Sequence, residues 1–344
     1  MPRDICSRWK TGDWTTPGKG IPRTLAKVLV TGGAGFIGSH VADLFLEKGY
    51  QVEIADDLST GKRENIPRRA AFHQIDVTSS DFSRMVRDGN FDVVVHTAAQ
   101  MDVRKSVADP INDATINILG TLNLMEALRA SRSKSRVVFT STGGVIYGDF
   151  NKPPNAEIYP KDPESPYAIA KLSIEYYLAY YGRVHGLDAV SLRCGNVYGP
   201  RQDLHGEAGV VAIFCGRILD NRPLTVYGDG LQTRDYVYVA DVARAIFAAA
   251  TKPLPERARV DARAFNIGTG VGTSVLEIAE RLQKAAGSDV PVEFAPHRAG
   301  ELQESFVNVD KARAALGWVP EVDLSAGLAK TYEWFAGRIA GAKA

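Results

Sequence analysis

The sequence has few cysteines and no long apolar run, and each shortage excludes a class of protein. Its 344 residues include three cysteines, Cys6, Cys194 and Cys215, which are widely spaced and form no C-x-x-C pair. That pattern argues against a disulfide framework and a zinc site, and it fits a reducing compartment. The histidines show no metal-ligand spacing, so no metal is expected. Neither a signal-peptide core nor about 18 uninterrupted apolar residues occurs, which predicts a cytosolic protein without membrane contact.

An excess of charge is also missing. Lysine and arginine number 41 against 40 aspartates and glutamates. The chain therefore has no global field that would attract nucleic acid or an anionic membrane, and any anionic ligand must be met by local groups. Residues 1–24 are polar and contain several Pro and Gly residues, so they are predicted to be a polar N-terminal tail.

Short β-rich runs alternate with helix-like stretches from Lys27 onward. The helix-like stretches, with apolar residues at helical spacing, are 38–49, 79–89, 112–131 and 165–186. The candidate strands are 27–31, 51–55, 70–75, 92–98, 136–141, 188–193 and 263–268. This alternation predicts an α/β fold with a doubly wound parallel sheet. After Arg193 the chain becomes rich in Gly and Pro, which indicates an inserted binding lobe, and residues 325–344 read as a closing helix.

The segment KVLVTGGAGFIGSH places Gly32, Gly35 and Gly38 between a strand and a helix. There a pyrophosphate can approach bare backbone and meet the N–H groups at a helix start, although a tight turn without a ligand has the same pattern. Asp56 ends the next strand, 18 residues beyond Gly38, where a carboxylate can accept hydrogen bonds from an adenosine ribose. The same charge repels a 2′-phosphate, so NAD is expected rather than NADP. Lys62 and Arg63 could offset that repulsion or simply be solvated.

The segment SPYAIAK places Tyr167 and Lys171 four residues apart, on one face of a helix. A phenol becomes a base near neutral pH when its pKa falls by about 3 units, which requires roughly 4 kcal/mol. An ammonium beside the phenol and a cationic nicotinamide above it would supply that energy. An ordinary amphipathic helix face is the alternative for the isolated pair.

From Lys27 to about Trp334 the chain resembles the extended short-chain dehydrogenase/reductases, and within them the NAD-dependent UDP-glucose 4-epimerases. The resemblance rests on TGGAGFIGSH, DDLSTGKREN, HTAAQMDVRKSV, NILGT, SPYAIAK, LRCGNVYGPRQD and GDGLQTRDYVYVADVA, in this order. It implies a cofactor-binding set of Gly32, Gly35, Phe36, Ile37, Gly38, Asp56, Asp76, Val77, Ala98, Asn117 and Lys171. It implies substrate contacts from Asn196, Thr225, Tyr227, Arg234 and Arg298. Taken alone, Arg234 could pair with Asp235, and Arg298 with Glu301.

Three parts are expected: the tail at 1–24, an NAD-binding Rossmann domain at 25–194 to which 231–268 returns, and a substrate-binding lobe at 195–230 and 269–340. A homodimer joined through helices near 113–131 and 166–183 is expected.

The chain departs from the family pattern near the tyrosine pair. Many relatives carry a catalytic Ser or Thr four residues before the tyrosine of their x-Y-G segment, and counting back from Tyr147 gives Gly143. Thr142 is the nearest replacement, with Ser141 behind it, and either could instead bond at the strand end. Nucleotide-sugar 4,6-dehydratases carry acids after that hydroxyl, where this chain has Gly143 and Gly144. Dehydration is therefore disfavoured.

These observations predict an NAD-dependent nucleotide-sugar 4-epimerase that interconverts UDP-glucose and UDP-galactose, with Tyr167, Lys171 and Thr142 as catalytic residues. A 4,6-dehydratase and a UDP-uronate 4-epimerase are the enzymatic alternatives. The non-enzymatic alternative is an NAD-binding regulatory protein of the same fold, but such a protein has no need of Tyr167 and Lys171. Ser305 aligns with a position where some relatives carry a bulky tyrosine, which predicts that N-acetylated sugars are also accepted. A surface-facing Ser305 is the alternative.

Overall fold

The structure is a computed structural model that describes residues 26–204, 209–297 and 302–343. The expected tail at 1–24 lies outside the described residues. Within them, no helix combines the length and the apolar character needed to cross a bilayer.

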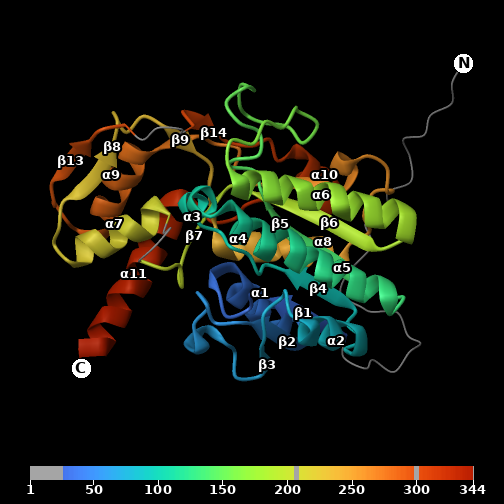
Figure 1. The fold of residues 1–344 in the computed structure, drawn as a ribbon. Helices are drawn as coiled ribbons and strands as arrows, with labels where there is room; N and C mark the ends of the chain where they lie inside the picture. The colour runs from blue at the N-terminus through green and yellow to red at the C-terminus, as the bar shows by residue number, and fades with distance from the viewer. Residues whose placement is uncertain (1–25, 205–208, 298–301, 344) are drawn as a thin grey trace, which may run out of the picture.

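A parallel sheet of seven strands forms the centre of the molecule (Figure 1). Its strands are β1 (Lys27–Thr31), β2 (Gln51–Asp56), β3 (Ala71–Gln74), β4 (Val93–His96), β5 (Arg136–Thr142), β6 (Asp188–Cys194) and β11 (Ala264–Ile267). They lie in the order β3-β2-β1-β4-β5-β6-β11, so the direction of winding reverses between β1 and β4. Ligands of such sheets bind at the carboxyl ends of the strands beside this switch point. The predicted doubly wound fold is confirmed.

Helices cover both faces of the sheet, so its strands are nearly continuous apolar runs. On one face lie α1 (Phe36–Glu47), α8 (Val239–Thr251) and α10 (Asp310–Leu316), which share a core with the sheet. On the other lie α2 (Ser80–Asp88), α5 (Gly120–Ala130) and α6 (Pro166–His185). Between β4 and α5 the chain forms α3 (Val103–Ala108), α4 (Pro110–Ala114) and the π-helical turn η2 (Thr115–Leu119). Short 3₁₀ turns are η1 (Arg63–Asn65) and η3 (Val260–Arg263).

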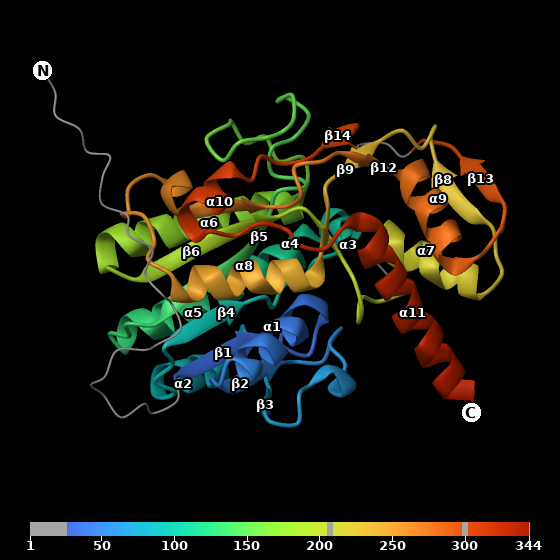
Figure 2. The same cartoon turned by 180° about the vertical axis from the view of Figure 1, so that it is seen from behind.

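A smaller lobe with its own apolar core lies at one side of the sheet (Figures 1 and 2). It contains α7 (Val210–Leu219), α9 (Val275–Ala286), α11 (Leu324–Lys343) and the paired strands β8 (Leu224–Tyr227) and β13 (Val292–Ala295). Three two-residue strands, β9 (Thr233–Arg234), β12 (Thr273–Ser274) and β14 (Glu304–Ser305), run between lobe and sheet, and β7 (Asn196–Tyr198) pairs with β10 (Tyr236–Tyr238). The chain leaves the sheet after β6 and returns with α8 and β11.

Candidate active site

The glycine turn after β1 has no room for side chains. Gly32 has a φ of +68°, and a Cβ there would lie 2.6 Å from the Ala98 nitrogen. A Cβ on Gly38 would collide with the Gly32 carbonyl oxygen. Gly35 is the N-cap of α1 and brings no side-chain cap, so the helix start presents bare backbone. This cradle fits a pyrophosphate, because helix N–H groups bind anions and no side chain stands in the way.

Asp56 holds the end of β2 against the glycine turn. Its carboxylate is buried, and it accepts hydrogen bonds from the Ala34 N–H at 3.0 Å and the Leu58 N–H at 2.8 Å. Burial raises the pKa of this carboxyl. Lys62 pairs with Asp203, while Arg63 donates to Gln74. Both cations therefore have partners other than Asp56, and its position fits a ribose with a free 2′-hydroxyl.

The loop after β4 borders the same turn. Asn117, buried in η2, accepts from the Gln100 N–H at 3.0 Å and donates to the Gln100 carbonyl at 3.0 Å. It thereby holds the segment after Ala98. The rest of the expected cofactor set frames the turn: Phe36 lies edge-on to His40, Ile37 packs on the core, Val77 is buried, and the exposed Asp76 accepts from Thr78.

Tyr167 and Lys171 share one face at the start of α6, as their spacing predicts. The Lys171 ammonium is buried, donates to the Thr140 carbonyl at 3.0 Å, and lies 5.7 Å from the centre of the Tyr167 ring. Burial lowers the pKa of Lys171 to about 8 and raises the pKa of Tyr167 above its usual range. The lysine alone therefore does not make Tyr167 a base; a further positive charge is needed.

The turn after β5 explains the missing hydroxyl. A Cβ on Gly143 would lie 2.9 Å from both the Arg193 carbonyl oxygen and Val307 Cγ1, so a serine does not fit. Ser141 and Thr142 point to opposite faces of the strand. Ser141 is buried and donates to Glu175 at 2.5 Å, whereas the Thr142 hydroxyl accepts from the Gly144 N–H at 3.3 Å. Of the two, Thr142 keeps its own proton available.

Three expected residues converge on Gly144. A Cβ there would lie 3.2 Å from Asn196 Oδ1 and 3.8 Å from Thr142 Oγ1. Ser305 is buried and donates to the Gly144 carbonyl at 2.8 Å, so the surface-facing alternative for Ser305 is wrong. Arg234 is the register partner of Ser305 in the next strand. The structure therefore brings Thr142, Asn196, Ser305 and Arg234 together.

Two further substrate candidates, Thr225 and Tyr227, lie on the lobe. Thr225 and Tyr227 are half-buried, while the alternating Leu224 and Val226 of β8 pack in the lobe core. The Asp235 carboxylate accepts hydrogen bonds from Thr269, Gly270 and Val307, and so connects three segments that are distant in sequence. Arg298 and Glu301 lie outside the described residues.

Two acidic residues near the tyrosine pair were missed by sequence reasoning. Glu175 forms a buried ion pair with Arg193 at 2.6 Å, behind the catalytic end of β5. Asp113 is buried beside Asn117. Both follow helical spacing, Glu175 four residues after Lys171 and Asp113 four before Asn117, which is the signal that could have found them.

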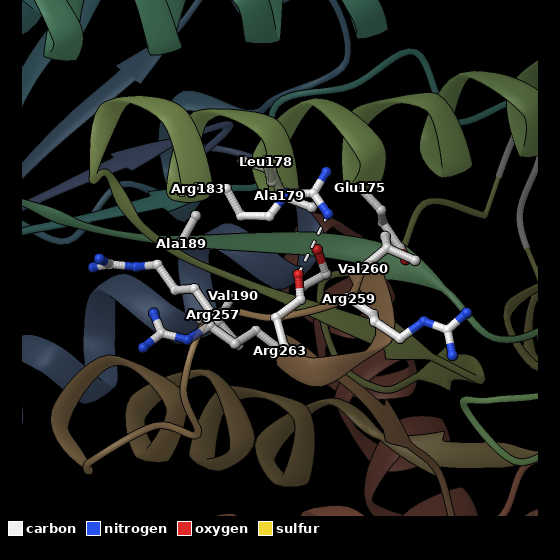
Figure 3. Close-up of a pocket in the computed structure, with 13 residues that line it drawn as sticks. Glu175, Leu178, Ala179, Arg183, Ala189, Val190, Arg257, Arg259, Val260 and Arg263 are labelled. Carbon is white, nitrogen blue, oxygen red and sulfur yellow. Dashed lines mark hydrogen bonds between the residues drawn. The ribbon is translucent and has the colours of Figure 1, made fainter.

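A separate hollow lies between α6, β6 and residues 257–263 (Figure 3). Its volume is about 30 Å³, room for one or two water molecules. Arg183, Arg257, Arg259 and Arg263 border it. Arg257 and Arg263 are paired with Asp188. This hollow is too small for a nucleotide sugar.

Comparisons with known proteins identify the family. Residues 28–268 match the model of the NAD dependent epimerase/dehydratase family. The chain is 43% identical over 314 residues to a UDP-glucose 4-epimerase of Mycolicibacterium smegmatis, covering 90% of this chain and 98% of that protein.

Two solved structures are also similar. A UDP-glucose 4-epimerase of Thermotoga maritima with UDP-glucose has a TM-score of 0.87 and 43% identity, over 91% of this chain and 99% of that one. A UDP-glucose 4-epimerase of Thermus thermophilus in complex with NAD has a TM-score of 0.83 and 44% identity, over 90% of this chain and 99% of that one. This chain belongs to the NAD-dependent epimerase/dehydratase family.

Proposed function

We propose that this protein is an NAD-dependent UDP-glucose 4-epimerase, which interconverts UDP-glucose and UDP-galactose. The observation that carries the proposal is the buried Lys171 beside Tyr167. The Lys171 ammonium donates to the Thr140 carbonyl of β5, and the last residue of that strand, Thr142, accepts from Gly144. The names and ligands of the relatives above support the same reaction.

NAD is the cofactor. Its pyrophosphate would lie on the backbone of Gly32, Gly35 and Gly38, and its adenosine ribose on Asp56. Phe36, Ile37, Asp76, Val77, Ala98, Asn117 and Lys171 complete the cofactor-binding set. When bound, NAD would supply the acceptor for the hydride of the sugar C4 and the donor that returns it.

The protein's own residues transfer the proton of the 4-hydroxyl and hold the sugar in position. Tyr167, as a phenolate, accepts the proton of the 4-hydroxyl, and the Thr142 hydroxyl donates to the same oxygen. Lys171 remains an ammonium and stabilises the phenolate. The 4-keto sugar then turns about its diphosphate link and receives the hydride on its other face, while Tyr167 returns the proton. No atom is gained or lost.

The substrate lobe holds the UDP part. Asn196, Thr225, Tyr227, Arg234 and Arg298 contact the nucleotide and its diphosphate, for which arginine offers a planar pair of donors. The small side chain of Ser305 leaves room for an N-acetyl group. We place the NAD-binding domain at 25–194 with 231–268, and the substrate lobe at 195–230 and 269–340, except that α10 (Asp310–Leu316) packs on the central sheet and not in the lobe.

The steric limits at Gly143 disfavour the dehydratase alternative. An acid at this position needs a Cβ that would press on the Arg193 carbonyl and Val307. A uronate epimerase uses the same proton and hydride steps, so the choice of sugar separates it from the proposed enzyme.

The protein acts in the cytosol as a homodimer in this proposal. Cys194 and Cys215 are free thiols. Along α4, η2 and α6, large apolar side chains are exposed, namely Ile111, Leu119, Ile169, Tyr176, Tyr177 and Tyr180. Such a patch is typical of a protein interface, and sedimentation of the purified protein tests it.

The test of function is incubation of the purified protein with UDP-glucose, without added NAD. We expect UDP-galactose to form, and the same mixture to be reached from UDP-galactose. Formation of a 4-keto-6-deoxy sugar, or turnover of UDP-glucuronate alone, would favour an alternative. No turnover of any nucleotide sugar would contradict the proposal.

A further inference from the structure

Asp113, on α4, is buried but incompletely bonded. The residue is 1% exposed. Its Oδ1 accepts from Gln100 Nε2 and from Asn117 Nδ2, both at 2.9 Å. Its Oδ2 is buried and has no hydrogen-bond partner among the described residues. A buried carboxylate oxygen without a partner is costly, and such an atom in a folded protein calls for an explanation.

The bonds of Asp113 do not neutralise it. Gln100 and Asn117 are neutral amides, and no ion pair within the described part of the chain includes Asp113. A clamp for the loop after β4 needs acceptors only, so an asparagine would serve that purpose at a lower cost of burial. The negative charge therefore has another role.

The candidate to balance the negative charge of Asp113 is the positive charge of the Lys171 ammonium. Helix α4 packs against α6, and after burial, which is the larger effect, the negative charge of Asp113 raises the pKa of both Tyr167 and Lys171. The ammonium is itself buried, and its one protein hydrogen bond among the described residues goes to a neutral carbonyl, that of Thr140. The two buried charges thus lie on helices that pack together, and neither has an ion-pair partner among the described residues.

Glu175, one turn after Lys171, is charged, but its carboxylate is paired with Arg193 at 2.6 Å. The other titratable groups described around the pair, His96 on β4, Cys194 on β6 and Tyr167 on α6 itself, are neutral in the NAD-free protein. Burial lowers the pKa of His96 to about 3 and raises the pKa of the Cys194 thiol to about 12. At neutral pH neither His96 nor Cys194 can balance an ammonium, and Glu175 is already neutralised by Arg193. Among the described residues around the pair, Asp113 is the acidic group without a cation of its own.

We propose that Asp113 is a positioning residue for the reaction: its buried negative charge balances the Lys171 ammonium and sets the pH range in which Tyr167 and Lys171 act. A negative charge disfavours loss of a proton from any nearby group, so it raises the pKa of the phenol and of the ammonium alike. Removing it must lower both values. The inference rests on the proposed epimerase function.

Asp113→Asn tests the proposal without changing volume. Its amide oxygen can keep the bonds from Gln100 and Asn117, while its amide nitrogen takes the place of the unpartnered oxygen. We expect both limbs of the pH profile of kcat/KM to move to lower pH, each by roughly half a unit or more. A purely structural loss lowers the height of the profile and leaves its limbs in place.

Two variants are matched controls. Asp109→Asn removes the same charge from the exposed N-cap of α4, where asparagine is also a good cap and water screens the charge. Gln100→Leu removes a bond to Asp113 and leaves its charge. We expect neither control to move the limbs. If Asp113→Asn does not fold, Asp113→Thr removes the same charge.

The outcomes separate the two claims. The role of Asp113 is overturned if the limbs of the kcat/KM pH profile of Asp113→Asn coincide with those of the parent. It is also overturned if these limbs move no further than those of Asp109→Asn. A parent protein that epimerises no nucleotide sugar overturns the proposed function instead. A readout independent of activity is the pH dependence of unfolding in NAD-free protein, in which the ionisation of Lys171 should move to lower pH in Asp113→Asn.

Discussion

Burial of the Lys171 ammonium contributes a loss of stability at neutral pH that is relieved as the pH rises. The amine has a pKa of about 8 in the folded protein, against about 10.4 in an unfolded chain. Between these two values the unfolded state binds more protons, so the stability contributed by this group rises with pH. Below pH 8 both states are protonated, and the full penalty applies.

The penalty follows from the difference in pKa. About 2.4 units correspond to roughly 3 kcal/mol at pH 7, of which about 2 kcal/mol is relieved by pH 9.5. Lys171→Met removes the titrating group at similar length. The stability difference between parent and variant therefore changes by about 2 kcal/mol over this range, in favour of the parent as pH rises. Losses common to every pH, such as the bond to Thr140, cancel in this comparison.

Urea unfolding of both NAD-free proteins at about pH 7 and pH 9.5 measures the change. NAD must be removed first, because a ligand that binds the folded state adds its own stabilisation. A stability difference that stays constant with pH, or that shifts in favour of Lys171→Met as pH rises, would refute the assignment of Lys171 as a buried ammonium.

Three further substitutions, with their controls, test the site. Thr142→Val should lower kcat at least tenfold if the Thr142 hydroxyl bonds the substrate oxygen. The control Ser141→Ala breaks only the bond to Glu175, so it should mainly lower the free energy of unfolding, by about 1–3 kcal/mol. Equal kinetics of Thr142→Val and parent would leave Thr142 a purely structural role. Gly143→Ser should destabilise the fold by about 1–3 kcal/mol without raising the rate, because its Cβ meets the Arg193 carbonyl; a more active variant would disprove the steric account. Ser305→Tyr should reject UDP-N-acetylglucosamine and keep UDP-glucose, with Ser305→Ala as the control of similar volume, and an unaltered ratio of the two rates would remove Ser305 as the gate.

Much of the fold could be predicted from the sequence because its strands are buried on both faces. Each expected strand lies within two residues of its observed bounds, from 27–31 to 263–268. The positions of the glycine turn, of Asp56 and of the pair of Tyr167 and Lys171 in these elements could also be predicted, because their spacing follows the period of a strand or a helix. Such local periodicity needs no knowledge of distant contacts.

The rest depends on contacts between distant segments. Gly143 lacks a side chain because Arg193 and Val307 occupy the space, and neither lies near it in sequence. Ser305 is buried by its approach to Gly144, and Ser141 is engaged by Glu175 from a different element. The balance of burial against charge at Tyr167 is likewise a tertiary property. Its spacing from Lys171 indicates a cation beside the phenol, but not the burial that raises the phenol pKa.

The central claim is that Tyr167 moves the proton while one hydride leaves C4 and returns to it. UDP-glucose deuterated at C4 tests this directly when it is incubated with the purified protein and followed by mass spectrometry and NMR. The account predicts UDP-galactose that retains the deuterium at C4, and a rate at least about 100-fold lower for Tyr167→Phe with its NAD still bound. Loss of the deuterium to solvent, or turnover of Tyr167→Phe close to that of the parent, would contradict it.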